Sequence, residues 1–171
     1  MRPKASSLPE CPCAATVESV GEWWSLLILR DAFLGLSRFD QFERSLGIAP
    51  NMLARRLKHL TERGIFERQP YQERPRRYAY LLTAKGRDFF PVIAAMIAWG
   101  NRQLAPDGAS MQLAMRDGGQ PVEPVLIDAG SAMPITPDSV IPVPGPRASP
   151  QMRARLLSLT APRPAAPPQN P

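Results

Sequence analysis

The sequence has few of the residues on which metal binding and catalysis depend. Its 171 residues include one histidine, His59, and two cysteines, Cys11 and Cys13, which one proline separates. This spacing is too short for an easy disulfide within the chain, and one distant histidine does not complete a zinc site. We also find no Ser-His-Asp-like set, no glycine-rich phosphate loop and no paired carboxylates in an apolar frame. We therefore expect no enzyme, no metal and no cofactor.

Long hydrophobic runs are also missing. The longest, at 23–29 and 89–100, fall short of the roughly 20 residues that span a bilayer, and residues 1–10 contain no secretory apolar core. We therefore expect a cytoplasmic protein with no membrane partner.

Aromatic residues and net charge are absent beyond residue 105. All 12 aromatic residues lie between Trp23 and Trp99, and the net charge of +6 is carried by residues 1–105, whereas 14 of the 21 prolines lie in residues 106–171. A core without aromatic residues is a poor core, so the packed domain should end soon after Trp99. We expect a flexible N-terminus at 1–10, a packed domain at 11–105, a small β-rich extension at 106–141 and a Pro/Ala-rich disordered tail at 142–171.

Three helices are expected in the first part of the domain. The first is closed by Gly21, and the second has so little polar face that it must be buried on most sides. Ser37 is a candidate N-cap for the third. The expected ranges are 13–20, 23–36 and 38–46.

A fourth helix is expected at 49–63. Leu53, Leu57 and Leu60 recur there at spacings of four and three, and a proline occupies the first turn, where its missing N–H is not needed. Gly64 can adopt the left-handed conformation that ends such a helix.

A β-hairpin with a charged tip is expected next. Two segments rich in branched and aromatic residues, 65–71 and 77–82, flank the basic turn-forming stretch 72–76. Helix, helix, turn, helix and basic hairpin form the order of a winged helix-turn-helix. The predicted fold class is therefore mainly α with a small β-hairpin wing, followed by the β-rich extension and the disordered tail.

The last helix of the domain is expected at 84–103. Thr83 is its candidate N-cap, and Pro91 should kink it near 87–91, because proline removes one backbone hydrogen bond. Its apolar face is wider than one small core needs. The apolar residues concerned are Phe89, Val92, Ile93, Met96, Ile97 and Trp99.

Short strands are expected in the extension. Apolar and polar residues alternate at 111–116, and the turn signal at 117–119 leads into 122–127. Residues 152–159 suit a brief amphipathic helix, but we assign no docking role to them, because a few apolar residues among prolines do not establish a docking site.

The fourth helix and the hairpin form a basic region. Residues 49–77 contain eight basic and three acidic side chains. With the leucines facing the core, the opposite face presents asparagine and arginine, which pair with adenine and guanine edges in the major groove, while the hairpin reaches the backbone or the minor groove. The candidate DNA-binding residues are Arg38, Pro50, Asn51, Ala54, Arg55, Arg56, Lys58, Arg74, Arg76 and Arg77.

Each of these candidates has a structural alternative. A basic helix face can simply be solvated, and hairpin arginines can serve solubility. Arg77 can point back into the sheet, Arg38 can position the turn, and Arg56 borders the outer face and suits a phosphate contact. Arg30 suits an ion pair with an acid such as Asp31 or Asp40. His59 suits a surface or phosphate-facing position better than a ligand role.

Residues 11–104 resemble the HxlR-type winged helix-turn-helix transcriptional regulators of the MarR-like superfamily. The matching motifs, in family order, are Cys11-Pro12, WSLLILR at 24–30, Arg38-Phe39, MLARRL at 52–57, RPRRY at 74–78 and LTAKG at 82–86. The resemblance implies a homodimer built from the first and last helices, with the apolar residues of 89–99 at its interface, that binds a palindromic operator as repressor or activator. Ala49 departs from the family, which often has a capping serine there.

The resemblance also implies, for some members, that a cysteine matching Cys11 senses oxidants or electrophiles. A thiol just before a helix can become reactive, although the adjacent Glu10 discourages thiolate formation and simple packing is the alternative. A small-molecule effector or an oxidant is therefore a further possible partner. The rival to the regulator hypothesis is a non-catalytic winged-helix module for protein–protein interaction, because the fold alone does not prove DNA binding.

Overall fold

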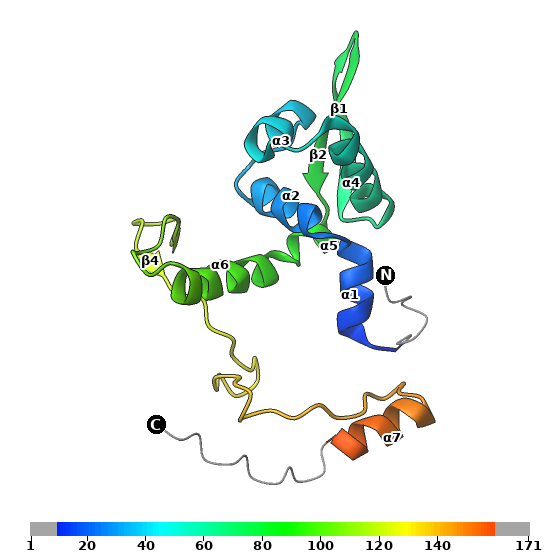
Figure 1. Ribbon diagram of the computed structural model, residues 1–171, viewed down its shortest axis with the longest axis vertical. Coiled ribbons are helices and arrows are strands. Elements are labelled where there is room, and N and C mark those ends of the chain that lie inside the picture. Colours follow the sequence, from blue (N-terminus) through cyan, green and yellow to red (C-terminus); the bar gives the residue numbers. More distant parts are fainter. Residues whose placement is uncertain (1–9, 160–171) are drawn as a thin grey trace. The chain divides into compact units, whose positions relative to one another are not determined.

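The computed structural model describes residues 10–159 of the chain. Residues 13–124 form one compact unit, and residues 10–12 and 125–159 belong to a second. The first unit contains α1 (Pro12–Val20), α2 (Trp23–Phe33), α3 (Phe39–Leu46), α4 (Pro50–Glu62), β1 (Phe66–Glu73), β2 (Arg76–Leu82), α5 (Ala84–Arg87), α6 (Phe90–Leu104), β3 (Leu113–Ala114) and β4 (Pro121–Val122) (Figure 1). This order confirms the predicted winged helix-turn-helix.

The core lies between α2, α3, α4 and the base of the hairpin, with α6 packed against it. Its fully buried apolar side chains come from α2, α3, α4 and β1. They are Ile28, Leu29, Phe42, Leu53, Leu57, Leu60 and Phe66. The second helix is less enclosed than its sequence predicts, because Trp23 is 60% exposed and stacks on Trp24 at 3.9 Å between ring centroids.

Most of the predicted helix boundaries are confirmed, with one wrong cap. Gly21 ends α1 with a φ of +92°, and Pro50 occupies the first turn of α4. Ser37 is not the N-cap of α3. Arg38 holds that position, and the side-chain oxygen of Gln41 accepts the backbone N–H groups of Ser37 and Arg38 at 3.0 and 2.9 Å.

The predicted long helix at 84–103 is two helices. Thr83 caps α5 as expected, since its hydroxyl accepts the Gly86 N–H at 3.1 Å. The chain leaves the helix at Asp88 and Phe89, and α6 then begins with Pro91 in its first turn. Proline is well tolerated in a first turn and costly inside a helix, so a break replaces the expected kink.

The wing is an antiparallel pair of strands that extends beyond α3 and α4 (Figure 1). Its register is regular except between Pro70 and Gln72, where Tyr71 is the extra residue of a bulge. The base of the wing is joined to the start of α3, because the Tyr80 N–H donates to the Ser37 carbonyl at 2.7 Å. The direction of the wing is therefore tied to the helices.

The first part of the extension packs on α6. Strands β3 and β4 pair as expected from the sequence but are short, and Arg102 on α6 forms a 2.9 Å ion pair with Glu123. Asn101 also donates to the Met111 carbonyl at 2.9 Å. The β3–β4 hairpin therefore belongs to the same unit as the winged helix, whereas the sequence suggested a domain boundary at residue 105.

The second unit contains a helix within the range that the sequence predicted as a disordered tail. This helix, α7 (Pro150–Leu159), starts with Pro150 after Ser149, whose hydroxyl accepts the Met152 N–H at 3.1 Å. A serine cap followed by proline is a helix start signal, and α7 contains the brief helix that the sequence suggested at 152–159. Residues 160–171 of the expected tail lie outside the described residues. No helix within residues 10–159 is long and apolar enough to cross a membrane.

Gly86 gives a direct test of the packing between α5 and the core. A Cβ atom at this position would lie 2.2 Å from the Ile65 carbonyl oxygen and 3.0 Å from Leu82 Cδ2. We therefore expect Gly86→Ala to lower the free energy of unfolding by about 1 to 3 kcal/mol in denaturant titrations. Gly100→Ala is the matched control, because that helical position has open space; it should raise stability by about 0.5 to 1 kcal/mol. If Gly86→Ala and Gly100→Ala changed the free energy of unfolding equally, the close packing of Gly86 against Ile65 would be contradicted.

Candidate nucleic-acid interface

Helix α4 presents three different faces. Leu53, Leu57 and Leu60 are fully buried and fix one face against the core. The opposite face is exposed, and the stripe between them meets the segment that contains α1 and the start of α2. Burial of the leucines determines which side chains point outward, as the sequence pattern predicts.

The outer face carries four of the predicted DNA-binding residues. Asn51, Ala54, Arg55 and Lys58 are all exposed on it. Lys58 lies 3.8 Å from Glu62 one turn later, a solvent-exposed pair that holds the ammonium group loosely. Pro50, at the start of the helix, is exposed as well. The sequence prediction of this surface therefore agrees with the exposure of its members.

Arg56 is a correction to the predicted set. Its residue surface is only 6% exposed, and its guanidinium forms an ion pair with Glu22 at the start of α2. Burial lowers the pKa of Arg56, and the neighbouring positive charge of Arg55 adds to this effect. A buried, paired guanidinium is not available to a phosphate, so Arg56 does not belong with the DNA-facing residues.

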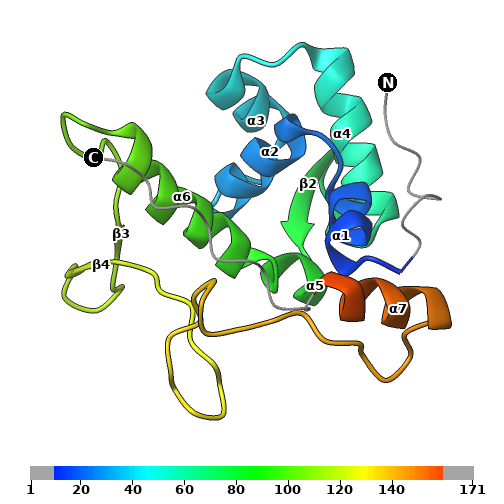
Figure 2. The ribbon, with the colours of Figure 1, turned by 60° about the horizontal axis from the view of Figure 1, so that its bottom comes forward.

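Two further residues, one in α4 and one just after it, contact α1. His59 is half-buried, and its Nε2 lies 3.0 Å from the backbone oxygen of Ser19. Arg63, just after the helix, lies 3.7 Å from Glu18. Figures 1 and 2 show the C-terminal end of α1 near the C-terminal half of α4. The phosphate-facing position expected for His59 is therefore not observed.

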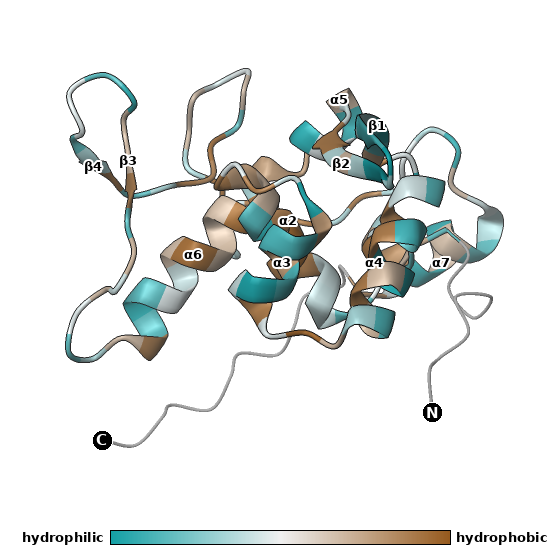
Figure 3. Cartoon of the chain, turned by 90° about the horizontal axis from the view of Figure 1, so that it is seen from above, coloured by the Kyte–Doolittle hydropathy of each residue, from teal (hydrophilic) through white to brown (hydrophobic). Residues whose placement is uncertain are grey.

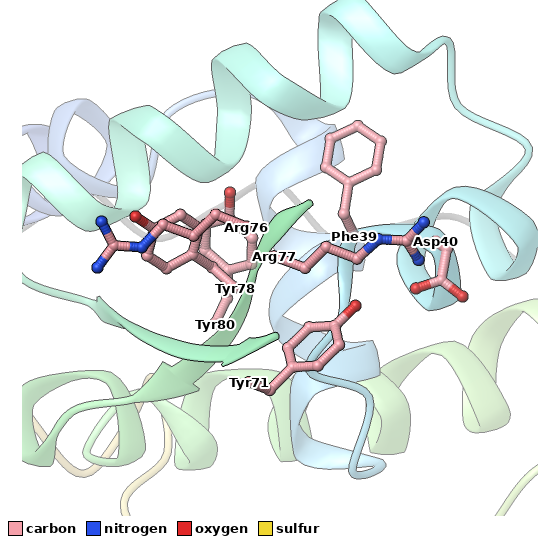
Figure 4. A pocket seen from close by; sticks show the side chains of 7 residues that line it. All are labelled: Phe39, Asp40, Tyr71, Arg76, Arg77, Tyr78 and Tyr80. Carbon is pink, nitrogen blue, oxygen red and sulfur yellow. The ribbon is translucent and has the colours of Figure 1, made fainter. Parts of the chain in front are cut away.

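The wing carries three exposed arginines at its tip, Arg74, Arg76 and Arg77. Arg76 lies over the ring of Tyr78 at 5.5 Å, and Arg68 lies over the same ring at 3.9 Å. Such stacking orders a guanidinium while leaving its N–H groups to bind other partners. Arg77 extends toward α3 rather than into the sheet (Figure 4).

Arg38 connects α3 to the wing. It is exposed, and its guanidinium lies 4.4 Å from the ring centroid of Tyr71. Tyr71 is the bulge residue of β1, and the bulge directs its ring toward α3. Arg38 thus lies where it can hold the wing against α3, which the sequence analysis named as the alternative to a phosphate contact. Between α3 and the wing lies a shallow pocket, lined by Phe39, Asp40, Tyr71, Arg76, Arg77, Tyr78 and Tyr80 (Figure 4).

Tyr71 is a residue that the sequence interpretation missed. The available signal was Pro70 inside a strand, since proline within a hairpin marks an edge or a bulge. Arg30, by contrast, is where the sequence suggested. It binds the buried carboxylate of Asp31 through Nε and Nη2 at 2.9 and 2.7 Å.

The predicted dimer residues of α6 divide into two groups. Ile93 is buried in the core of its own protomer, and Phe89 and Ile97 are partly buried against that core, so these three face inward. Val92, Met96 and Trp99 are 44%, 47% and 54% exposed and recur at helical spacing on the opposite face. Figure 3 shows apolar segments along α6. Only the second group is free to contact another molecule.

The two cysteines lie at the start of α1. Cys11 is half-buried and Cys13 is exposed, and both are free thiols. Within residues 10–159, no three His, Cys, Asp or Glu side chains gather closely enough to hold a metal ion.

Comparisons with known proteins agree with this geometry. Residues 19–108 match the model of the HxlR-like helix-turn-helix family. An uncharacterized HTH-type transcriptional regulator of Mycobacterium tuberculosis, MT3179, is 44% identical over 131 residues, which are 76% of this chain and 83% of that protein.

Solved structures of proteins described as transcription factors or regulators are also similar to this chain. PA1374 of Pseudomonas aeruginosa, described as a proposed transcription factor, is 52% identical and aligns with a TM-score of 0.62 over 85% of this chain and 99% of that one. The redox regulator HypR in its reduced form is 30% identical, with a TM-score of 0.51, over 57% of this chain and 99% of that one.

The contact between Arg38 and Tyr71 can be tested at the wing. An exposed cation–π contact contributes about 0.5 to 1 kcal/mol, so Tyr71→Leu should speed amide exchange in residues 70–77 about two- to fivefold. Tyr71→Phe keeps the ring and should exchange like the unchanged protein. Equal exchange in the Leu and Phe variants would show that the stacking does not hold the wing.

Proposed function

The chain belongs to the HxlR-like helix-turn-helix family of transcriptional regulators, and we propose that it acts as a homodimer on a palindromic DNA operator. In this proposal α4 enters the major groove, and the β1–β2 wing follows the adjacent backbone. The observation that carries the proposal is the exposed, basic outer face of α4 beside an exposed basic wing tip.

Most of the arginines on these surfaces have no carboxylate partner within residues 10–159, although Lys58 pairs loosely with Glu62. Among the described residues, Arg55, Arg74, Arg76 and Arg77 form no ion pair with a carboxylate. By contrast, the basic residues that face the rest of the protomer, Arg30, Arg56 and Arg63, each have an acidic partner. Uncompensated positive charge on a helix face and a hairpin tip matches the negative charge of a DNA backbone.

The dimer rests on the exposed stripe of Val92, Met96 and Trp99. Exposed apolar side chains at helical spacing gain free energy when a second copy covers them. A two-fold dimer presents two copies of α4, and successive major grooves on one side of DNA are about 34 Å apart. The operator should therefore contain inverted half-sites with centres about 10 bp apart.

Redox control through Cys11 is a further part of the proposal. The half-buried thiol lies directly before α1, and HypR, a relative named as a redox regulator, has a similar fold. A reactive thiol next to a helix that contacts α4 is well placed to change DNA binding.

Two arginine substitutions separate base reading from backbone contact. Arg55→Ala should cost about 1 to 3 kcal/mol on the operator and relax discrimination at one base position. Arg76→Ala should weaken all duplexes alike and reduce the slope of log affinity against log salt by about 1. Fluorescence anisotropy with operator and scrambled duplexes across a salt series measures both. If the two variants behave alike on both duplexes, the division between helix and wing is wrong.

A charged substitution on α6 tests the dimer. Met96→Glu places a carboxylate in the proposed apolar interface, so it should shift the protein from dimer to monomer in sedimentation experiments. Leu34→Glu is the control, because Leu34 is an exposed apolar residue outside α6. A dimeric Met96→Glu protein would exclude this face of α6.

A further inference from the structure

One stripe of α4 is polar and faces the rest of the protomer. Arg56, His59 and Arg63 follow one another at intervals of three and four residues, so they lie along one side. Their partners, Glu22, Ser19 and Glu18, lie at the end of α1 and the start of α2. We call these three contacts the α1–α4 seam.

The contact between Glu22 and Arg56 is the most enclosed of the three. Arg56 is buried and Glu22 is half-buried, whereas the contact between Arg63 and Glu18 is solvent-exposed. An exposed ion pair contributes little, so the geometry of the seam depends mainly on Arg56 and His59.

Stability alone does not explain the buried ion pair. Removing a guanidinium from water is costly, and Nε of Arg56 is buried without a hydrogen-bond partner among the described residues. Well-packed apolar residues often replace buried ion pairs without loss of stability. A directional ion pair does, however, fix the rotation of α4 about its own axis, whereas interchangeable apolar contacts leave that rotation adjustable.

Because Arg56 follows Arg55 in the sequence, the rotation of α4 also decides the direction of Arg55. Adjacent residues lie about 100° apart around a helix. Holding Arg56 against Glu22 therefore holds Arg55 on the outer face. Lys58 and His59 are related in the same way, with His59 held at the Ser19 carbonyl.

We propose that Glu22, Arg56 and His59 are positioning residues that set the rotation of α4 relative to the DNA groove and couple it to α1. This inference rests on the proposed function, because it concerns how α4 reads DNA. Coupling is reciprocal, so a correctly docked α4 should in turn stabilise α1.

The test compares two neutralised carboxylates. Glu22→Gln breaks the seam, whereas Glu62→Gln removes the same charge from the exposed side of α4, where the Glu62 carboxylate lies 3.8 Å from the Lys58 ammonium group. Both raise the net charge by one, so both should tighten non-specific binding similarly. Only Glu22→Gln should lower the ratio of operator to scrambled-duplex affinity, by about tenfold.

A second readout separates positioning from a loss of fold. Amide hydrogen exchange of residues 12–20 should slow when the unchanged protein or Glu62→Gln binds the operator. This response should disappear in Glu22→Gln and in the double variant Glu22→Gln/Arg56→Met, with circular dichroism verifying that both are folded. Because Met is an apolar replacement for the ion pair, the double variant should keep its unfolding temperature while it loses discrimination.

The outcomes distinguish the inference from the function on which it rests. If the unchanged protein shows no preference for any duplex, the proposed function fails. If it discriminates and Glu22→Gln matches Glu62→Gln in both the affinity ratio and the exchange of α1, the positioning role is wrong. If folded variants lose stability in proportion to discrimination, the seam is only structural and the inference is likewise overturned.

Discussion

The structure depends on the burial of one face of α4. Leu53, Leu57 and Leu60 are inaccessible to solvent, and their contacts with α2, α3 and the base of the wing join the elements of the winged helix into one core. Because a helix is rigid, burying this face decides which of its other side chains point outward, although interchangeable apolar contacts leave the exact rotation of the helix adjustable. The outer basic face and the seam to α1 are both consequences of that burial.

The sequence predicted the order of the elements and the outer face of α4 well, because both follow from apolar spacing. Gly21, Pro50 and Thr83 also marked helix ends through local backbone chemistry, which needs no knowledge of distant contacts. The division of the last helix was mistaken for a kink. Pro91 fits the start of a new helix as well as a bend within one, so the local sequence does not separate the two cases.

The misplaced residues are those whose partners lie far away in the chain. Arg56 and His59 have the same basic character as Arg55 and Lys58, but Glu22 and Ser19, more than 30 residues earlier, determine their environment. Ile93 was similarly grouped with an intermolecular face although α6 buries it in its own core. Periodicity separates buried from exposed sides of a helix, but it does not show which neighbour covers a side.

The most direct test of the account is selection of bound duplexes from a random DNA pool with the full-length protein at moderate salt. The account predicts an inverted repeat whose half-sites are centred about 10 bp apart, with affinity that falls about a thousandfold or more between about 50 and 200 mM salt. If no motif is enriched and binding does not depend on salt, the account is contradicted, and the basic helix and wing would instead serve an interaction with an acidic protein.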